Sequence, residues 1–263
     1  MPSPWSVRLE PAFVVLAVVA AVLYVRAWRR EPGPAWRAWC FGAGLALVVV
    51  ALNSQLGTIA VHYLVLFHLL QNVMISDWAP PLLLIGLTPS MRAALAARGG
   101  PLFETITRPA ITLPTWLVAW YVIHLGAVYD AAVQNGLLLA IEHAVLIAVG
   151  LLFWWPVLCD VPRSLATLGR IGYVFAAFVL SAFLGLALTF SPPLYGYYED
   201  LPERLWGITA RQDQNLGGIL MSTEQAVVFF GAIVWLLIRL LREEAEAEER
   251  LAAEQRAAGL REQ

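Results

Sequence analysis

Long apolar stretches alternate with short polar segments along the whole chain. Seven such stretches occupy residues 12–28, 39–53, 58–78, 110–128, 136–158, 171–190 and 216–241. Most are close to the roughly 20 residues that an α-helix needs to cross about 30 Å of hydrocarbon. Helices satisfy their own backbone hydrogen bonds in lipid, and no alternating pattern of about ten residues indicates a barrel. The pattern predicts an all-α integral membrane protein, a bundle of seven transmembrane helices.

Composition supports the same class. Of the 263 residues, 60% are hydrophobic and 14% are charged, which is more apolar than a soluble domain of this size can bury in one core. The chain contains no lysine. A seven-helix photoreceptor that holds retinal through a Schiff base is therefore excluded.

Arginines predict which helix ends face the cytoplasm. They follow the first, third, fifth and seventh stretches, as Arg26, Arg29, Arg30, Arg37, Arg92, Arg98, Arg108, Arg163, Arg170, Arg239 and Arg242. Because basic residues collect in short cytoplasmic loops, we predict that the N-terminus lies outside and the C-terminus inside. Residues 1–242 then form the transmembrane domain, and the charged segment 243–263 forms a cytoplasmic helical tail.

All four histidines fall in the outer half of this predicted bundle. At 1.5 Å per residue, His62 lies about 7 Å and His68 about 16 Å below the outer surface. His124 lies about two turns below the same surface, and His143 lies about 10 Å deep. Ionisable groups within a membrane normally face the bundle interior and serve a site. We therefore predict an outward-facing polar pocket lined by histidines.

Other residues are expected at the same level. They are Gln71, Asn72, Glu142, Asp213, Gln214 and Met221. Imidazole and thioether are copper ligands, the thioether favours the cuprous ion, and a nearby carboxylate can fix an imidazole tautomer. We predict that His68, His124 and His143 bind copper, with Met221 as a weak ligand and His62 as an additional candidate.

Simpler interpretations of these residues remain open. A histidine or amide in a membrane helix is often a hydrogen-bond partner of another helix, and a methionine often only fills space. Asp213 is placed to cap the N-terminus of the last helix. Asp77, at the inner end of the third stretch, is interpreted as an interfacial residue.

Four sequence blocks occur in a fixed order within residues 62–221. They read HLLQNVMISDWAPPLLLIGLTP, IHLGAVYDAAVQN, IEHAVLIAVGLLFWWPVL and DQNLGGILM. Together they resemble the CtaG family of cytochrome c oxidase assembly factors. The resemblance implies a multi-pass protein of the bacterial plasma membrane that helps to deliver copper to the heme-copper centre. It also implies three partners: oxidase subunits, an extracytoplasmic copper carrier and membrane lipid.

The resemblance assigns residues by position. The matching residues are His68 and Gln71 for the family's H-x-x-Q-H block, His124 for its span-four histidine, Glu142 and His143 for its E-H pair, and Asp213 and Gln214 for its D-Q pair. Asn72 stands where the second histidine of the H-x-x-Q-H block is expected. An amide oxygen is a poor ligand for the cuprous ion, so this departure weakens the implied copper role.

Two other functions fit the same features. A metal-free accessory or structural subunit of a respiratory oxidase complex needs the bundle but no copper. A heme-binding membrane protein would use pairs of these histidines as axial ligands. We expect no enzymatic activity and no nucleic-acid partner.

Overall fold

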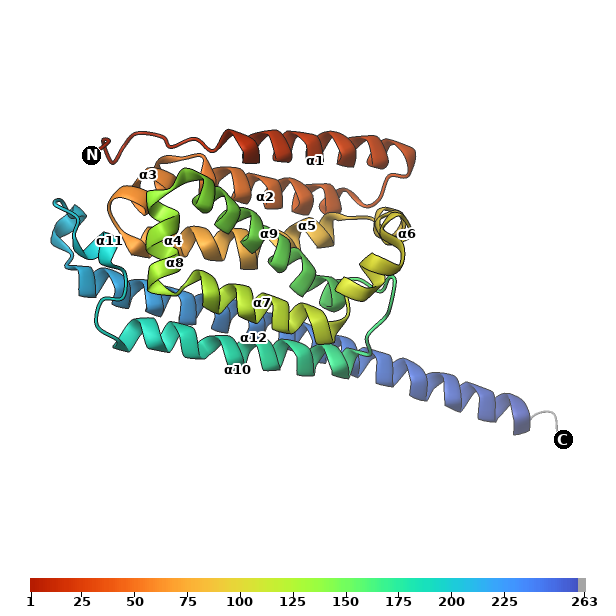
Figure 1. Cartoon of the computed structure of the whole chain (residues 1–263). Helices are drawn as coiled ribbons and strands as arrows, with labels where there is room; N and C mark the ends of the chain where they lie inside the picture. Colours follow the sequence, from red (N-terminus) through yellow and green to blue (C-terminus); the bar gives the residue numbers. More distant parts are fainter. Residues whose placement is uncertain (260–263) are drawn as a thin grey trace.

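The computed structural model describes residues 1–259, which form a bundle of helices (Figure 1). Five helices are long and apolar enough to cross a membrane: α1 (Pro11–Arg30), α2 (Ala35–Leu52), α9 (Gly136–Leu158), α10 (Thr167–Phe190) and α12 (Ala210–Gly259). No strand occurs within these 259 residues. The prediction of an all-α protein with several candidate membrane spans is confirmed.

The number of spans differs from the prediction. α7 (Pro109–Ile123) and α8 (Gly126–Gln134) meet at 72° and add a sixth span if the bent pair crosses as one. The described residues therefore contain five or six candidate spans, and the predicted count of seven is not confirmed. The third apolar stretch is not among these spans, because a break at Leu64 and the π-helical turn at Met74–Trp78 divide it into elements that are each shorter than a span.

The segment predicted as a single span at 58–78 is divided into shorter elements. These and their continuation are α3 (Gln55–His62), α4 (Val65–Val73), the π-helical turn η1 (Met74–Trp78) and α5 (Ala79–Gly86). The break between α3 and α4 lies at Leu64, whose backbone is extended with φ −138° and ψ 124°. From α4 to α5 the chain is helical without a gap, so the continuous helix is displaced toward the C-terminus of the predicted span.

One residue, Ala79, separates the π turn of η1 from two prolines. Pro80 and Pro81 lack backbone N–H groups, so they remove two donors from the helical ladder at this point. Gly150 of α9 packs against the same turn, because a Cβ atom there would lie 2.3 Å from the carbonyl oxygen of Ser76. Single π turns of this kind are frequent at functional sites.

Close contact between α10 and α12 holds the long C-terminal helix against the bundle. A Cβ atom on Gly218 would lie 2.6 Å from the backbone nitrogen of Thr189, so only glycine permits this approach. Small residues at such contacts are typical of helices packed within a membrane.

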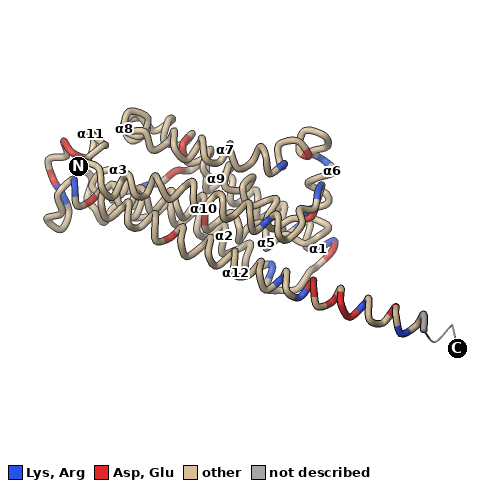
Figure 2. The backbone as a smooth tube through the Cα atoms, turned by 90° about the horizontal axis from the view of Figure 1, so that it is seen from below, with Lys and Arg blue, Asp and Glu red and all other residues tan. Residues whose placement is uncertain are grey.

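Most charged residues lie toward the two ends of the bundle and along the projecting C-terminal part of α12 (Figure 2). The N-terminus and the short α11 (Gly196–Glu199) lie at one end, which we call the N-terminal end, and α6 (Pro89–Ile106) lies at the other (Figure 1). A single 3₁₀ turn, η2 (Leu205–Gly207), precedes α12. The side of the membrane that each end faces stays a prediction.

The predicted tail begins inside α12, which continues without a break beyond residue 243 to Gly259 and extends past the other helices (Figure 1). Residues 260–263 of that tail lie outside the described residues.

Candidate functional site

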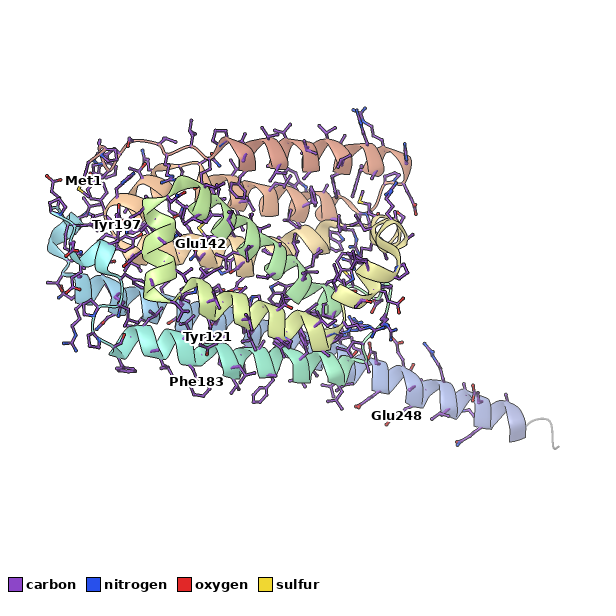
Figure 3. All side chains as sticks on the ribbon, viewed as in Figure 1. Met1, Tyr121, Glu142, Phe183, Tyr197 and Glu248 are labelled. Carbon is purple, nitrogen blue, oxygen red and sulfur yellow. The ribbon has the colours of Figure 1, made fainter. Side chains whose placement is uncertain are left out.

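Three of the four histidines come together inside the bundle. His68 belongs to α4, His124 follows the last residue of α7, and His143 belongs to α9. All three are buried, with exposed fractions of 0%, 3% and 0%. The ring centroids of His68 and His143 are 6.1 Å apart, and all three imidazoles lie within electrostatic range of Glu142. We call these four residues the histidine cluster; Figure 3 labels Glu142 toward the N-terminal end.

Glu142 occupies the middle of the histidine cluster. Its Oε1 lies 3.2 Å from Nε2 of His68 and accepts a hydrogen bond of 3.1 Å from Nδ2 of Asn72. Its Oε2 is buried without a hydrogen-bond partner. Asn72 therefore orients the carboxylate of Glu142 through its amide N–H. This is a positioning contact, and it does not require Asn72 to bind a metal ion.

Two of the imidazoles have a fixed tautomer because their Nδ1 atoms face obligate acceptors. Nδ1 of His124 lies 2.6 Å from the carbonyl oxygen of Trp120. Nδ1 of His143 lies 3.0 Å from Oε2 of Glu10. A carbonyl or a carboxylate accepts, so in both rings Nδ1 carries the hydrogen.

His68 has the same tautomer for a less direct reason. Its Nδ1 lies 3.0 Å from the hydroxyl of Tyr198, which donates its one hydrogen to the carbonyl oxygen of Ala60 at 2.6 Å. Burial raises the pKa of Tyr198 well above its ordinary value, so the hydroxyl keeps that hydrogen. The oxygen of Tyr198 must then accept from His68, and Nδ1 of His68 carries the hydrogen.

The second ring nitrogen of each imidazole has no hydrogen-bond partner. Nε2 of His68, His124 and His143 are all buried and unpaired, and the short contact of His68 with Glu142 lacks hydrogen-bond geometry. Histidines that bind metals show this arrangement, in which one nitrogen is held by an outer partner and the other is available. The three Nε2 atoms can bind a proton or a metal ion.

The described residues do not contain a complete coordination shell. Within residues 1–259, no group of three or more histidine, cysteine, aspartate or glutamate side chains is spaced to hold a metal ion. Imidazole nitrogens are donors for copper, zinc, iron or nickel, whereas binding by all three rings at once requires them to move.

Three other predicted pocket residues hold the fold around the cluster. Asp213 accepts from the backbone N–H groups of Val65 and Leu66, both at 2.9 Å. It thus caps α4, not its own helix as the simpler interpretation proposed. Gln71 donates to the carbonyl oxygen of Ala51 at 2.5 Å.

Gln214 fixes the segment that follows α10. Its Oε1 accepts from the backbone N–H of Leu194 at 2.6 Å, and its Nε2 donates to the carbonyl oxygen of Leu188 at 3.1 Å. Both contacts are structural, and they position the chain that leads into α11.

The remaining predicted ligands are placed differently. Met221 is completely buried in the main hydrophobic core. His62 is the last residue of α3, beyond the break at Leu64, and the charges that act on it are those of Arg8 and the N-terminal amine. The structure does not bring His62 into the histidine cluster.

Sequence reasoning missed Glu10 and Tyr198. Glu10 is half of a carboxylate–histidine contact that spans 133 positions of sequence, and its backbone N–H donates to Oδ1 of Asn53 at 2.7 Å. Glu10 is the one acidic residue before the first apolar stretch, and this was the only feature of the sequence that distinguished it. Tyr198 lies in a loop rich in tyrosine, and nothing local distinguishes it from Tyr197.

A groove reaches the cluster from the side of the bundle. It has a volume of about 850 Å³, lies between α7, α8 and α9, and has Glu142 among its otherwise mainly apolar lining. A second groove of about 870 Å³ touches α1, α2, α5, α6 and α9. Neither groove is lined by a histidine, so the predicted histidine-lined pocket open to the outside stays a prediction.

Comparison with known families gives one match. Residues 19–243 match the family described as cytochrome c oxidase caa3 assembly factor (Caa3_CtaG). No curated protein and no solved structure matches the chain. The match includes α2 to α10 and all three imidazoles of the histidine cluster, and it covers most of the sequence. The chain belongs to the family of cytochrome c oxidase caa3 assembly factors.

Proposed function

We propose that this protein assists the assembly of cytochrome c oxidase without enzymatic activity, by receiving copper at the histidine cluster and releasing it to the oxidase. The observation that carries the proposal is the state of the three imidazoles. Each is held through Nδ1, and each presents a buried Nε2 with no partner.

The cuprous ion suits this donor set. Imidazole nitrogen and thioether sulfur bind it, whereas the carboxylate oxygen of Glu142 is a harder donor. Glu142 instead supplies a negative charge that balances an incoming cation in an apolar interior. A metal ion and a proton compete for Nε2 of each ring, because only an unprotonated imidazole nitrogen binds metal.

Low coordination favours transfer. The rings of His68 and His143, with centroids 6.1 Å apart, form the nearest pair, and a third ligand would have to move to join them. A site held by few ligands exchanges its metal readily with an acceptor.

The segment that includes α11 packs against His68. Tyr198 covers Nδ1 of His68, and the carbonyl oxygen of Tyr198 accepts from Arg204, which also pairs with Asp213 at 2.9 Å. This segment lies at the N-terminal end, which the arginine pattern predicts to be extracytoplasmic. We expect a copper carrier and the oxidase to meet the protein there.

The test is copper retention by a variant that lacks all three rings. The purified protein is loaded with Cu(I) under reducing conditions, freed of unbound metal and measured by elemental analysis. We expect His68→Ala/His124→Ala/His143→Ala to lose bound copper and to fail in oxidase assembly, while His62→Ala retains both. Equal copper content in the triple variant and the wild type, with the helical content of both unchanged, would refute the proposal.

A metal-free structural subunit is the second candidate. It is favoured by the burial of all three imidazoles and by their Nδ1 contacts with other parts of the chain. Stable co-purification with mature oxidase at equal copy number, without copper in the isolated protein, would favour it. A heme-binding role would be recognised by a Soret band in the isolated protein.

A further inference from the structure

A pair of carboxylates lies deeper in the bundle than the histidine cluster. Asp77 belongs to the π turn η1, and Glu224 belongs to α12. Asp77 is completely buried, and Glu224 is 7% exposed. The interpretation of Asp77 as an interfacial residue is therefore wrong, because the helix that contains it starts later and brings this residue into the interior.

The two carboxylates act on each other and have few other partners. They lie within electrostatic range of one another. Oε1 of Glu224 accepts from the indole N–H of Trp78 at 2.7 Å, whereas Oε2 of Glu224 and both oxygens of Asp77 are buried without a hydrogen-bond partner. Three carboxylate oxygens thus remain unpaired in the membrane interior.

No positive side chain compensates this pair. Within residues 1–259 neither Asp77 nor Glu224 forms an ion pair. The nearby hydroxyl of Ser76 donates to the carbonyl oxygen of Asn72 at 2.7 Å. His68 is already held by Tyr198 and Glu142.

Two adjacent negative charges are not stable in such a place. An ionised carboxylate that leaves water without a partner is strongly disfavoured, and two neighbouring carboxylates in one site cannot both ionise. A bound cation must therefore reduce the charge of the pair. The smallest such ligand is a proton, which also supplies a donor for one of the unpaired oxygens.

We propose that Asp77 and Glu224 form a proton-binding site in the membrane interior, distinct from the histidine cluster, that holds at least one proton at neutral pH. Trp78 orients Glu224, and the π turn places Asp77 opposite it.

One member of the proton-binding pair, Asp77, lies on the helix that carries His68. Asn72 donates to Glu142, and Ser76, one turn later, donates to the carbonyl oxygen of Asn72. Asp77 follows directly. Asp77 and His68 therefore lie on one continuous helix, from α4 into η1, whereas Glu224 faces Asp77 from α12.

Chemical labelling of the full-length protein in detergent tests the proposal. Dicyclohexylcarbodiimide is an apolar reagent that modifies protonated carboxyl groups, and peptide mass spectrometry locates the product. We expect label on Asp77 or Glu224 at neutral pH, with less label as pH rises and no effect of Na⁺ or K⁺ at fixed pH. The exposed Glu104, paired with Arg163, is the control and should stay unlabelled.

Infrared spectroscopy provides a measurement that does not depend on reagent access. The wild type should show the C=O stretching band of a protonated carboxylic acid, and Asp77→Asn/Glu224→Gln should lose it, whereas Glu104→Gln should keep it. If the double variant does not fold, the single variants Asp77→Asn and Glu224→Gln serve, and each should reduce or shift the band. Absence of this band from the wild type would overturn the proposal. Protection from labelling by Na⁺ at fixed pH would also overturn it, because the pair would then bind a metal cation and not a proton.

Discussion

At the scale of single residues, each imidazole of the histidine cluster is held by a different kind of acceptor. The Nδ1 partner is a hydroxyl for His68, a backbone carbonyl for His124 and a carboxylate for His143. The three contacts have one result, because each leaves Nε2 as the nitrogen with an available lone pair in the neutral ring.

Removal of the Tyr198 hydroxyl tests how Nδ1 of His68 is held. We expect Tyr198→Phe to destabilise the protein by about 1–3 kcal/mol, because the Nδ1–H of His68 and the carbonyl oxygen of Ala60 both lose a buried partner. Cu(I) affinity should also fall by roughly tenfold or more. Equilibrium unfolding in detergent and competition with a Cu(I) chelator measure the two effects. The matched control Tyr197→Phe should change stability by less than about 0.5 kcal/mol; equal effects of the two substitutions contradict the assignment.

Asn72 permits the opposite experiment. We expect Asn72→His to tighten Cu(I) binding by on the order of tenfold, about 1.4 kcal/mol, because it adds an imidazole beside Glu142. The larger ring should cost about 1–3 kcal/mol of stability through overpacking. A chelator titration and a thermal unfolding curve give both values. Unchanged copper affinity in a folded variant would show that position 72 does not face the metal.

The sequence was sufficient to select the residues of the histidine cluster and insufficient to explain them. His68, His124, His143 and Glu142 were recognisable because polar groups in apolar stretches are rare. Glu10 and Tyr198 were not, since each meets its histidine across more than 100 positions of chain and neither lies in an apolar stretch.

At the scale of helices, the division of the third apolar stretch is the main departure from the hydrophobic pattern. A hydropathy pattern does not reveal a helix break when the free backbone groups at the break form hydrogen bonds with a distant part of the chain. Here the carboxylate of Asp213, 148 positions away from Val65, accepts the first N–H groups of α4. That long-range cap stabilises the start of α4 at residue 65, and Asp77, twelve positions later on the same continuous helix, is completely buried.

The cap can be tested directly. We expect Asp213→Ala to destabilise the protein by on the order of 2 kcal/mol, because two backbone N–H groups and Arg204 lose their acceptor. Asp213→Asn keeps one acceptor oxygen and should cost less. Unfolding in a denaturing detergent series measures both. Stability of the alanine variant within about 0.5 kcal/mol of the wild type would mean that α4 does not depend on this cap.

At the scale of the whole molecule, the bundle separates two polar sites along its length. The histidine cluster lies toward the N-terminal end, and the carboxylate pair lies deeper, with apolar packing around both. The charged residues at the two ends of the bundle (Figure 2) agree with a chain that crosses a membrane between them.

The arginine pattern predicts which end faces which compartment. We expect a fluorescent protein fused to the C-terminus to fluoresce in the cytoplasm, and an alkaline phosphatase fused at the same point to be inactive, since that enzyme needs export to fold. The reverse result, an active phosphatase and a dark fluorescent protein, would place the histidine cluster on the cytoplasmic side and remove its access to an extracytoplasmic carrier.

The most direct test of the copper role is X-ray absorption spectroscopy of the Cu(I)-loaded protein. The account predicts a copper ion with two or three imidazole nitrogens, with or without one sulfur from Met221, and loss of the imidazole scattering in His68→Ala/His124→Ala/His143→Ala. A spectrum without imidazole ligands, or one that the triple substitution leaves unchanged, would contradict the claim that these three rings receive the metal.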